Sequence, residues 1–222
     1  MKFKKQTVVI KGGASSIGLA AAHLIQKNNG TPLLLDMDLK KLNEAQRTLN
    51  LTDSIFEVDV SDEAELNNCL DFALEKLPPI KGLVCSAGKA PIPKRIEDTE
   101  LSEWNNIIES HLTGTFLSCK IFGGQMAKIG GGSIVNISSV VGFNPGPVLA
   151  YGAAKGAIIN LSKSLSVQWA SSNVRVNAVA PGWTDTPLLQ PKERKEKRDL
   201  TPILNAVPQN RLMNANEIAE LI

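Results

Sequence analysis

Short runs of apolar residues alternate along the chain with longer segments that have the period of a helix. The apolar runs are Thr7–Ile10, Leu33–Leu35, Ile55–Val58, Leu83–Cys85, Ser133–Ile137 and Val174–Val179. Between them, apolar residues recur at about every third or fourth position, which predicts helices. The predicted helices are Ile17–Lys27, Leu39–Leu49, Glu63–Leu77, Ser102–Lys128 and Ala150–Ser171. Either Asp62 or Ser61 is expected to cap the third of them.

The apolar runs show no alternation of polar and apolar positions, which is typical of parallel strands covered on both faces. Strands and helices alternate regularly, and connections between parallel strands are right-handed. This predicts an α/β fold, a doubly wound parallel sheet between two layers of helices. The chain has 222 residues and shows no internal repeat or linker, so we expect one domain over residues 1–222. A sheet of this kind binds its ligand in the crevice at the carboxyl ends of the strands.

Composition narrows the classes of function. The residues are 43% hydrophobic and 21% charged, and the net charge of +2 argues against a nucleic-acid partner. Three cysteines and two histidines without ligand-like spacing argue against a metal site and a disulfide framework. We find neither a signal-peptide core nor an apolar stretch of about 18 residues, so we expect a cytoplasmic protein without a membrane partner.

A dense run of charges, Lys192–Asp199, lies within the irregular segment Pro181–Pro208. Its mixed signs and the prolines around it favour a solvated helix or a mobile lid over a binding tail.

The first predicted strand leads into the glycine-rich stretch Lys11–Gly18, after which a helix begins. Such a turn presents backbone N–H groups and the positive end of the helix dipole to a phosphate, although it can also merely connect strand and helix. Asp59 and Val60 end the third strand, where an adenine ring can lie.

Asp36 ends the second strand, 18 residues beyond Gly18. A carboxylate there can accept hydrogen bonds from both hydroxyls of an adenosine ribose and repels a 2′-phosphate, which favours NAD over NADP. The alternative is that Asp36 caps the next helix, a role for which Asp38 competes.

Tyr151 and Lys155 stand one helical turn apart, so both side chains lie on one face of the helix. A tyrosine acting as a base near neutral pH needs its pKa lowered by about 3 units, or about 4 kcal/mol. An ammonium about 5 Å away supplies about 3 kcal/mol at an effective dielectric constant of about 20. The preceding strand, which ends in Ser138-Ser139, offers a hydroxyl to the same crevice. The alternative is a tyrosine stacked on a lysine stem at a helix surface.

These motifs resemble the short-chain dehydrogenase/reductase family, in its single-domain branch, over essentially the whole chain. The motifs are Gly12…Ile17-Gly18, Asp59-Val60, Ala87-Gly88, Asn136–Ser139, Tyr151…Lys155 and Pro181-Gly182…Thr186. The resemblance implies a Rossmann fold, a nicotinamide cofactor, a secondary alcohol or ketone as substrate, and a homodimer or homotetramer.

The resemblance also implies roles for individual residues. Ser139 matches the residue that orients the substrate, Tyr151 the general acid/base, and Lys155 the residue that lowers the tyrosine pKa and holds the nicotinamide ribose. With His111, these are the candidate catalytic residues. The candidate cofactor-binding residues are Gly12, Ser15, Ser16, Ile17, Gly18, Asp36, Asp59, Val60, Ala87, Gly88, Tyr151, Lys155, Pro181, Gly182, Thr184 and Thr186.

The chain departs from the family pattern at four places. Lys11 replaces a threonine, Ser16 the middle glycine, and Cys85-Ser86 an asparagine pair. His111 replaces the asparagine that kinks the long helix, where it can hold a relay water, shuttle the proton itself or only fill space. The sequence also ends without the family's closing strand.

We therefore expect an NAD(H)-dependent oxidoreductase that transfers hydride between the cofactor and a secondary alcohol or ketone, with Tyr151 as general acid/base. The alternative is a catalytically weak or inactive nicotinamide-nucleotide-binding regulator of the same fold, motivated by the departures. A nucleic-acid or scaffold function rests only on the charge run, whose interleaved acids oppose it.

Overall fold

A six-stranded parallel sheet forms the centre of the computed structural model, which describes residues 3–189 and 199–222. Its strands are β1 (Thr7–Lys11), β2 (Thr31–Asp36), β3 (Ile55–Glu57), β4 (Ile80–Cys85), β5 (Gly132–Ile137) and β6 (Val174–Val179). Their order across the sheet is β3-β2-β1-β4-β5-β6, and every neighbouring pair is parallel. The predicted α/β fold, a doubly wound parallel sheet, is confirmed.

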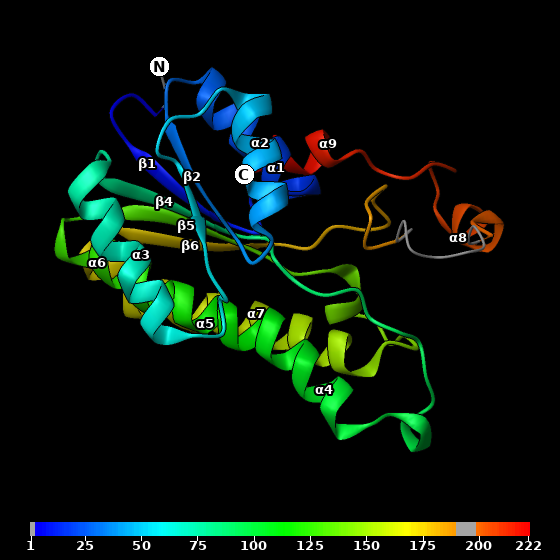
Figure 1. Cartoon of the computed structure of the whole chain (residues 1–222). Coiled ribbons are helices and arrows are strands. Elements are labelled where there is room, and N and C mark those ends of the chain that lie inside the picture. Colours follow the sequence, from blue (N-terminus) through cyan, green and yellow to red (C-terminus); the bar gives the residue numbers. More distant parts are fainter. Residues whose placement is uncertain (1–2, 190–198) are drawn as a thin grey trace.

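Helices cover both faces of this sheet (Figure 1). On β1, Val8 and Ile10 pack against α1 (Ser16–Lys27) and α2 (Leu39–Leu49), while Val9 between them joins the core of the opposite face. The opposite core includes α3 (Glu63–Lys76), α5 (Gly114–Ser118) and α6 (Gly124–Lys128), with α7 (Leu149–Gln168) at its margin. Alternate residues of one apolar strand thus serve two cores, which explains why the strands are apolar throughout.

The long helix predicted over Ser102–Lys128 is interrupted by two wider turns. It begins as α4 (Leu101–Ile108), passes through the π-helical turn η2 (Glu109–Thr113) into α5, and passes through a second π turn, η3 (Cys119–Gly123), into α6. Each π turn adds a residue to the helical turn and shifts the faces of the helix that follow. His111 lies within η2.

Two aspartates fix the starts of helices by accepting backbone hydrogen bonds. The Asp38 side chain accepts from the Lys41 amide at the start of α2, and the Asp62 side chain accepts from Ala64 and Glu65 at the start of α3. Asp62, rather than Ser61, is therefore the cap of the third helix, and Asp38 leaves Asp36 outside the capping role.

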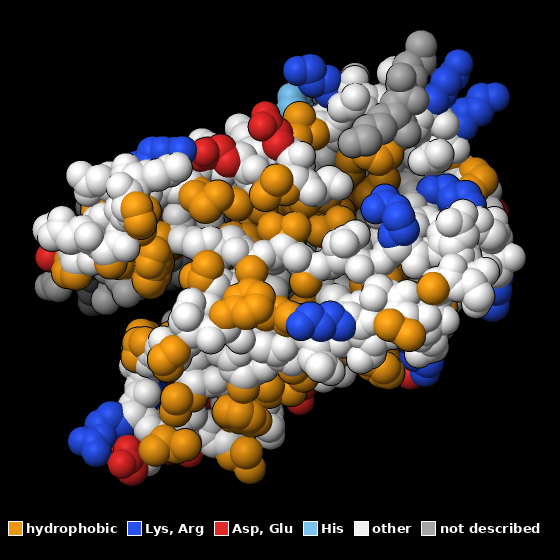
Figure 2. Space-filling model, turned by 180° about the vertical axis from the view of Figure 1, so that it is seen from behind, with side chains coloured by type: hydrophobic (Ala, Val, Ile, Leu, Met, Phe, Trp, Pro, Cys, Tyr) orange, Lys and Arg blue, Asp and Glu red, His pale blue; other side chains and the backbone are white. Residues whose placement is uncertain are grey.

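Three short helical turns lie in connecting segments: η1 (Ile96–Asp98), η4 (Val140–Gly142) and η5 (Ala170–Ser172). Seen from behind, the molecule is hollowed between two arms, and hydrophobic side chains gather along the hollow (Figure 2). In the part of the chain that the structure describes, no helix is long and apolar enough to cross a membrane. The charge run Lys192–Asp199 lies outside the described residues except for its last member.

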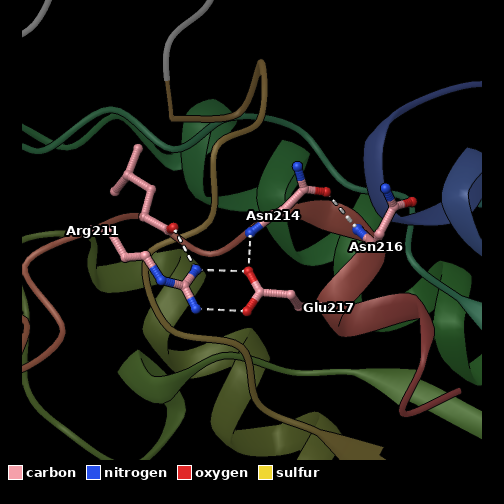
Figure 3. A network of polar contacts seen from close by, with 5 residues as sticks. Arg211, Asn214, Asn216 and Glu217 are labelled. Atoms are coloured by element: carbon pink, nitrogen blue, oxygen red, sulfur yellow. Dashed lines mark hydrogen bonds and ion pairs between the residues drawn. The ribbon is translucent and has the colours of Figure 1, made fainter.

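The C-terminal segment folds back onto α1 through α9 (Ala215–Ala219), after α8 (Thr201–Ala206) (Figure 1). Arg211 donates to both carboxylate oxygens of Glu217 at 2.8 Å, and Glu217 also accepts from the Asn214 amide (Figure 3). The Arg211 guanidinium lowers the pKa of Glu217 to about 2. Among the described residues no strand pairs with the outer edge of β6.

Substitution of Phe122 tests how strongly the free energy of unfolding depends on the core between the sheet and the helices α3, α5 and α6. Its side chain is fully buried in η3, whereas Phe143 is 67% exposed. Phe122→Ala is expected to lower the free energy of unfolding by about 3–5 kcal/mol, since it removes buried surface and leaves a cavity. Phe143→Ala, the control, is expected to change it by less than about 0.5 kcal/mol. Urea denaturation measures both, and equal effects would contradict this placement of the core.

Candidate active site

A cleft of about 690 Å³ lies at the carboxyl ends of the strands. It extends from Asp36 at the end of β2, along the turn after β1, to Tyr151 and Lys155 on α7. The strand order reverses between β1 and β4, so the connections of these two strands leave in opposite directions and open a crevice. The predicted site residues that line it are Gly12, Ser15, Ser16, Ile17, Asp36, Asp59, Val60, Ala87, Gly88, His111, Tyr151, Lys155 and Thr186.

The glycine-rich turn forms one wall of the cleft, and its geometry explains its composition. Gly12 has a φ of +75°, and a Cβ there would lie 2.6 Å from the Ala87 backbone. A Cβ on Gly18 would collide with the Gly12 carbonyl, so Gly18 lies behind the turn instead of facing the cleft. Ser16 has a φ of +47°, the left-handed region that a glycine adopts more easily. The serine therefore keeps the path of the turn at the cost of backbone strain.

Ser86 joins this turn to the end of β4. Its hydroxyl donates to the Lys11 carbonyl at 3.0 Å, and the Ser86 and Ala87 amides donate to the same carbonyl. A single hydroxyl thus makes the bridge for which the family pattern has an asparagine amide.

Asp36 lines the cleft and is not the cap of α2, since Asp38 has that role. One Asp36 carboxylate oxygen accepts a hydrogen bond from the Asp38 amide at 3.2 Å. Burial raises the pKa of Asp36, while the hydrogen bond from Asp38 and the charge of Lys41 oppose that shift. Because Asp36 lines the cleft and the Asp38 amide binds only one of its carboxylate oxygens, the other oxygen can accept a hydrogen bond from a ligand.

Asp59 and Val60 lie beside Asp36 where β3 ends. The Asp59 carboxylate accepts from the Ser61 amide at 2.9 Å and from the Ser61 hydroxyl at 2.6 Å, and these bonds lower its pKa. Val60 is nearly buried. Together they form a polar rim with an apolar floor.

Tyr151 and Lys155 meet at the other end of the cleft. The Lys155 ammonium lies 5.4 Å from the centroid of the Tyr151 ring and donates to the Ile137 carbonyl at 2.6 Å. Lys155 is buried and Tyr151 is partly buried, so the alternative of a stacked pair at a helix surface is wrong. Ser139 hydrogen-bonds with Tyr151, although Ser139 is not among the residues that line the cleft.

Burial determines the direction in which the pKa values of Tyr151 and Lys155 shift. It raises the pKa of Tyr151, and only the hydrogen bond with Ser139 opposes that shift. Burial also lowers the pKa of Lys155 to about 7, with a further contribution from the charge of Lys11. In the protein alone, the net shift of the Tyr151 pKa is therefore upward, because the loss of hydration outweighs the hydrogen bond with Ser139.

His111 packs edge-on against Tyr151, with the ring centroids 5.0 Å apart. Its Nε2 lies 2.9 Å from the Lys89 carbonyl, which can only accept, so Nε2 carries the proton and Nδ1 is a free acceptor. Nδ1 is buried and has no hydrogen-bond partner among residues 3–189 and 199–222. Burial lowers the pKa of His111 well below its usual value, and the charges of Lys155 and Lys11 add to this. Gly88 provides the room, since a Cβ there would overlap the imidazole.

The segment after β6 contributes less to the cleft than expected. Thr186 lines the cleft, but Pro181, Gly182 and Thr184 do not. The Thr184 hydroxyl donates to the Gly182 carbonyl at 3.2 Å, and the Pro181 carbonyl accepts from the Val140 amide at 3.1 Å. These groups stabilise the loop itself.

A second, smaller cavity of about 200 Å³ adjoins the cleft at Tyr151. Apolar side chains dominate its wall: Ile92, Trp104, Ile107, Pro147, Val148 and Leu149. Lys89 lines both cavities. Sequence reasoning missed this chamber because its wall combines two segments about 50 residues apart, and only their contact in the fold reveals it.

The polar groups required by a dinucleotide are thus present in one continuous cleft. The comparisons with known proteins agree: the profile of the family described as short chain dehydrogenase matches residues 6–197. This chain belongs to the short chain dehydrogenase family. As a member of it, the protein is an oxidoreductase that acts on CH–OH groups with a nicotinamide cofactor.

Relatives within the family differ in substrate and cofactor. The chain is 31% identical to cis-4-hydroxycyclohexanecarboxylate dehydrogenase of Sinomonas cyclohexanicum, covering 99% of this chain and 88% of that one. It is 32% identical to the NADP-dependent (R)-specific alcohol dehydrogenase of Lentilactobacillus kefiri, covering 98% and 88%. The crystal structure of NAD⁺-bound xylitol dehydrogenase superposes with a TM-score of 0.91 at 26% identity, covering 100% of this chain and 92% of that one.

The buried basic groups make the stability of this short chain dehydrogenase depend on pH. Folding lowers the pKa of Lys155 from 10.5 to about 7 and that of Lys11 from 10.5 to about 8. Between pH 7 and 9 the unfolded chain therefore binds more protons than the folded chain, so the free energy of unfolding rises with pH. Urea midpoints measured at pH 7, 8 and 9 should increase in that order.

Lys155→Met removes one of the two contributions and should make this rise shallower. The window ends near pH 9, because burial raises the pKa of Cys69 to about 12 and ionisation of this thiol in the unfolded chain then acts in the opposite direction. A midpoint that falls between pH 7 and 9 would contradict the burial of the two lysines.

Proposed function

We propose that the protein is an NAD(H)-dependent oxidoreductase that interconverts a secondary alcohol and its ketone, with Tyr151 as the general acid/base. The observation that carries the proposal is the meeting of Tyr151 and Lys155 at one end of a cleft whose other end holds Asp36, with Ser139 hydrogen-bonded to Tyr151. The acid/base group and the ribose-binding carboxylate thus lie on one continuous surface.

The residues of the cleft fit a nicotinamide dinucleotide. The turn after β1 lines the cleft at Gly12, Ser15 and Ser16 where α1 begins, so the backbone N–H groups at the start of this helix would bind a pyrophosphate. Asp36 would hold the adenosine ribose, and Lys155 would hold the nicotinamide ribose. The bound nicotinamide supplies or accepts the hydride.

The chain's own contribution is the proton. In reduction, the Tyr151 hydroxyl gives its proton to the substrate oxygen, which the Ser139 hydroxyl orients; in oxidation, the tyrosinate takes the proton back. Because burial raises the pKa of Tyr151, the phenol is protonated at neutral pH, the form that reduction requires. The rate of oxidation should accordingly increase with pH.

His111 completes this end of the site as a hydrogen-bond acceptor. Its pKa lies well below the usual value, so the ring is neutral at neutral pH, and Nδ1 offers a buried lone pair beside Tyr151. These features favour a role in holding a donor such as a relay water over one in carrying the proton itself.

The adjoining chamber supports an apolar substrate. Its wall of aliphatic and aromatic side chains opens at Tyr151, so an alkyl or alicyclic group can occupy it while the carbonyl faces the phenol.

Tyr151→Phe tests the proposal. Loss of the phenolic proton should lower kcat for ketone reduction by about 10²–10⁴-fold. NADH binding, followed by cofactor fluorescence, should stay within about twofold, since the ring remains in place. Lys163→Met, an exposed residue of the same helix, is the control and should leave kcat unchanged. Full activity of Tyr151→Phe would contradict the proposal, and wild-type protein that binds NADH without turning over any ketone of a broad panel would favour the regulator.

Asp36 tests the choice of cofactor. A 2′-phosphate placed against the carboxylate should weaken NADPH binding relative to NADH by about tenfold or more, equivalent to about 1.4 kcal/mol. Asp36→Asn removes the charge and should bring the ratio of the NADPH and NADH dissociation constants closer to 1. Asp62→Asn is the control: it weakens the cap of α3, Asp62 does not line the cleft, and the ratio should stay unchanged. NADPH binding as tightly as NADH in the wild type would contradict the assignment.

A further inference from the structure

Lys11 is a fully buried lysine whose ammonium bonds to three separate segments. It is the last residue of β1 and has no exposed surface. Its Nζ donates to the Ser110 carbonyl in η2 at 2.9 Å, to the Ala87 carbonyl after β4 at 3.3 Å, and to the Thr115 hydroxyl in α5 at 3.4 Å. Every proton of the ammonium thus has an acceptor, which is what a buried charge requires.

The packing around Lys11 is shaped to its side chain. A Cβ on Gly114 would lie 3.1 Å from Lys11 Cε and 2.8 Å from a methyl group of Val60, so only a glycine leaves room for the lysine stem. Burial lowers the pKa of Lys11 to about 8, and the ammonium therefore remains mostly protonated at neutral pH.

Two of the acceptors of Lys11 belong to residues that directly precede His111 and its neighbour Gly88. Ser110 precedes His111 in the π turn, and Ala87 precedes Gly88, on which the imidazole rests. Lys11 ties these two segments together from the side of the sheet, and the His111 bond to the Lys89 carbonyl ties them from the side of the cleft. A shift of the π turn would move the imidazole relative to the Tyr151 ring.

We infer that Lys11 is a positioning residue, whose ammonium holds the π turn against the end of β4 so that His111 stays edge-on to Tyr151. The inference rests on the proposed function, in which Tyr151 moves the proton. It assigns a role to a position at which the sequence had shown only a departure from the family pattern.

The electrostatic surroundings of Lys11 give the inference a second signature. Titratable groups on four elements interact electrostatically with Lys11: Cys85 on β4, Cys119 in η3, His111 in η2 and Lys155 on α7. The charge of Lys11 lowers the pKa of both His111 and Lys155. Removing it should therefore shift the ionisation of Lys155 to higher pH.

Lys11→Met keeps the length of the stem and removes the charge and the three donors. It should lower kcat by about 10- to 100-fold through misplacement at the site. The dissociation constant for NADH should change by less than about threefold, and the limb of the pH profile of kcat that reports Lys155 should move to higher pH. Lys81→Met is the matched control: Lys81, at the opposite end of β4, also donates to two backbone carbonyls, those of Ile129 and Gly131, and its loss should leave kcat and the pH profile unchanged.

The ¹⁵N NMR signals of the two histidines, assigned with His23→Gln, report the position of His111 independently of activity. In the wild type His111 should show one neutral tautomer with its proton on Nε2, and in Lys11→Met it should exchange between tautomers. Lys11→Thr, which is shorter and also uncharged, is the second variant if the methionine variant does not fold.

The inference is overturned if a folded Lys11 variant keeps the wild-type kcat, pH profile and His111 tautomer. It is also overturned if His111 already exchanges between tautomers in the wild type. Its failure is distinguishable from that of the proposed function: full activity in Tyr151→Phe would remove the catalytic role, while the His111 signals of Lys11→Met would still decide whether Lys11 fixes the ring.

Discussion

The reversal of strand order between β1 and β4 is the constraint on which the site depends. Connections that leave two adjacent parallel strands in opposite directions cannot fill the space above their ends. Into that space the fold brings the glycine-rich turn from β1, the Ala87–Lys89 segment from β4 and the start of α7. Each arrives from a different part of the sequence, and their proximity follows from the topology rather than from any single local motif.

Basic side chains enter the buried floor of this crevice. Lys11 and Lys155 both have their ammonium groups on backbone carbonyls, those of Ser110 and Ile137 respectively, and each charge lowers the pKa of its neighbours. His111 remains neutral between them. Hydrogen bonding to carbonyls allows these two cations to be buried near each other.

The order of strands and helices was predictable from the sequence, because strands buried on both faces are apolar throughout and amphipathic helices have a clear period. The pairing of Tyr151 with Lys155 was predictable for the same reason, since i and i+4 fix one face of a helix. The direction of the tyrosine pKa was not. Coulomb's law needs only a distance, whereas desolvation depends on everything packed around the phenol, which is known only after folding. The bonds of Lys11 were likewise hidden, because their acceptors lie 76 to 104 residues away.

The imidazole of His111 fills the space that any side chain at position 88 would need. The effects of substitutions at these two positions should therefore not be additive. An asparagine at position 111 would free part of that space, and only then would an alanine at position 88 fit. A histidine at position 111 therefore requires a glycine at position 88, which restricts the sequence backgrounds that tolerate this residue.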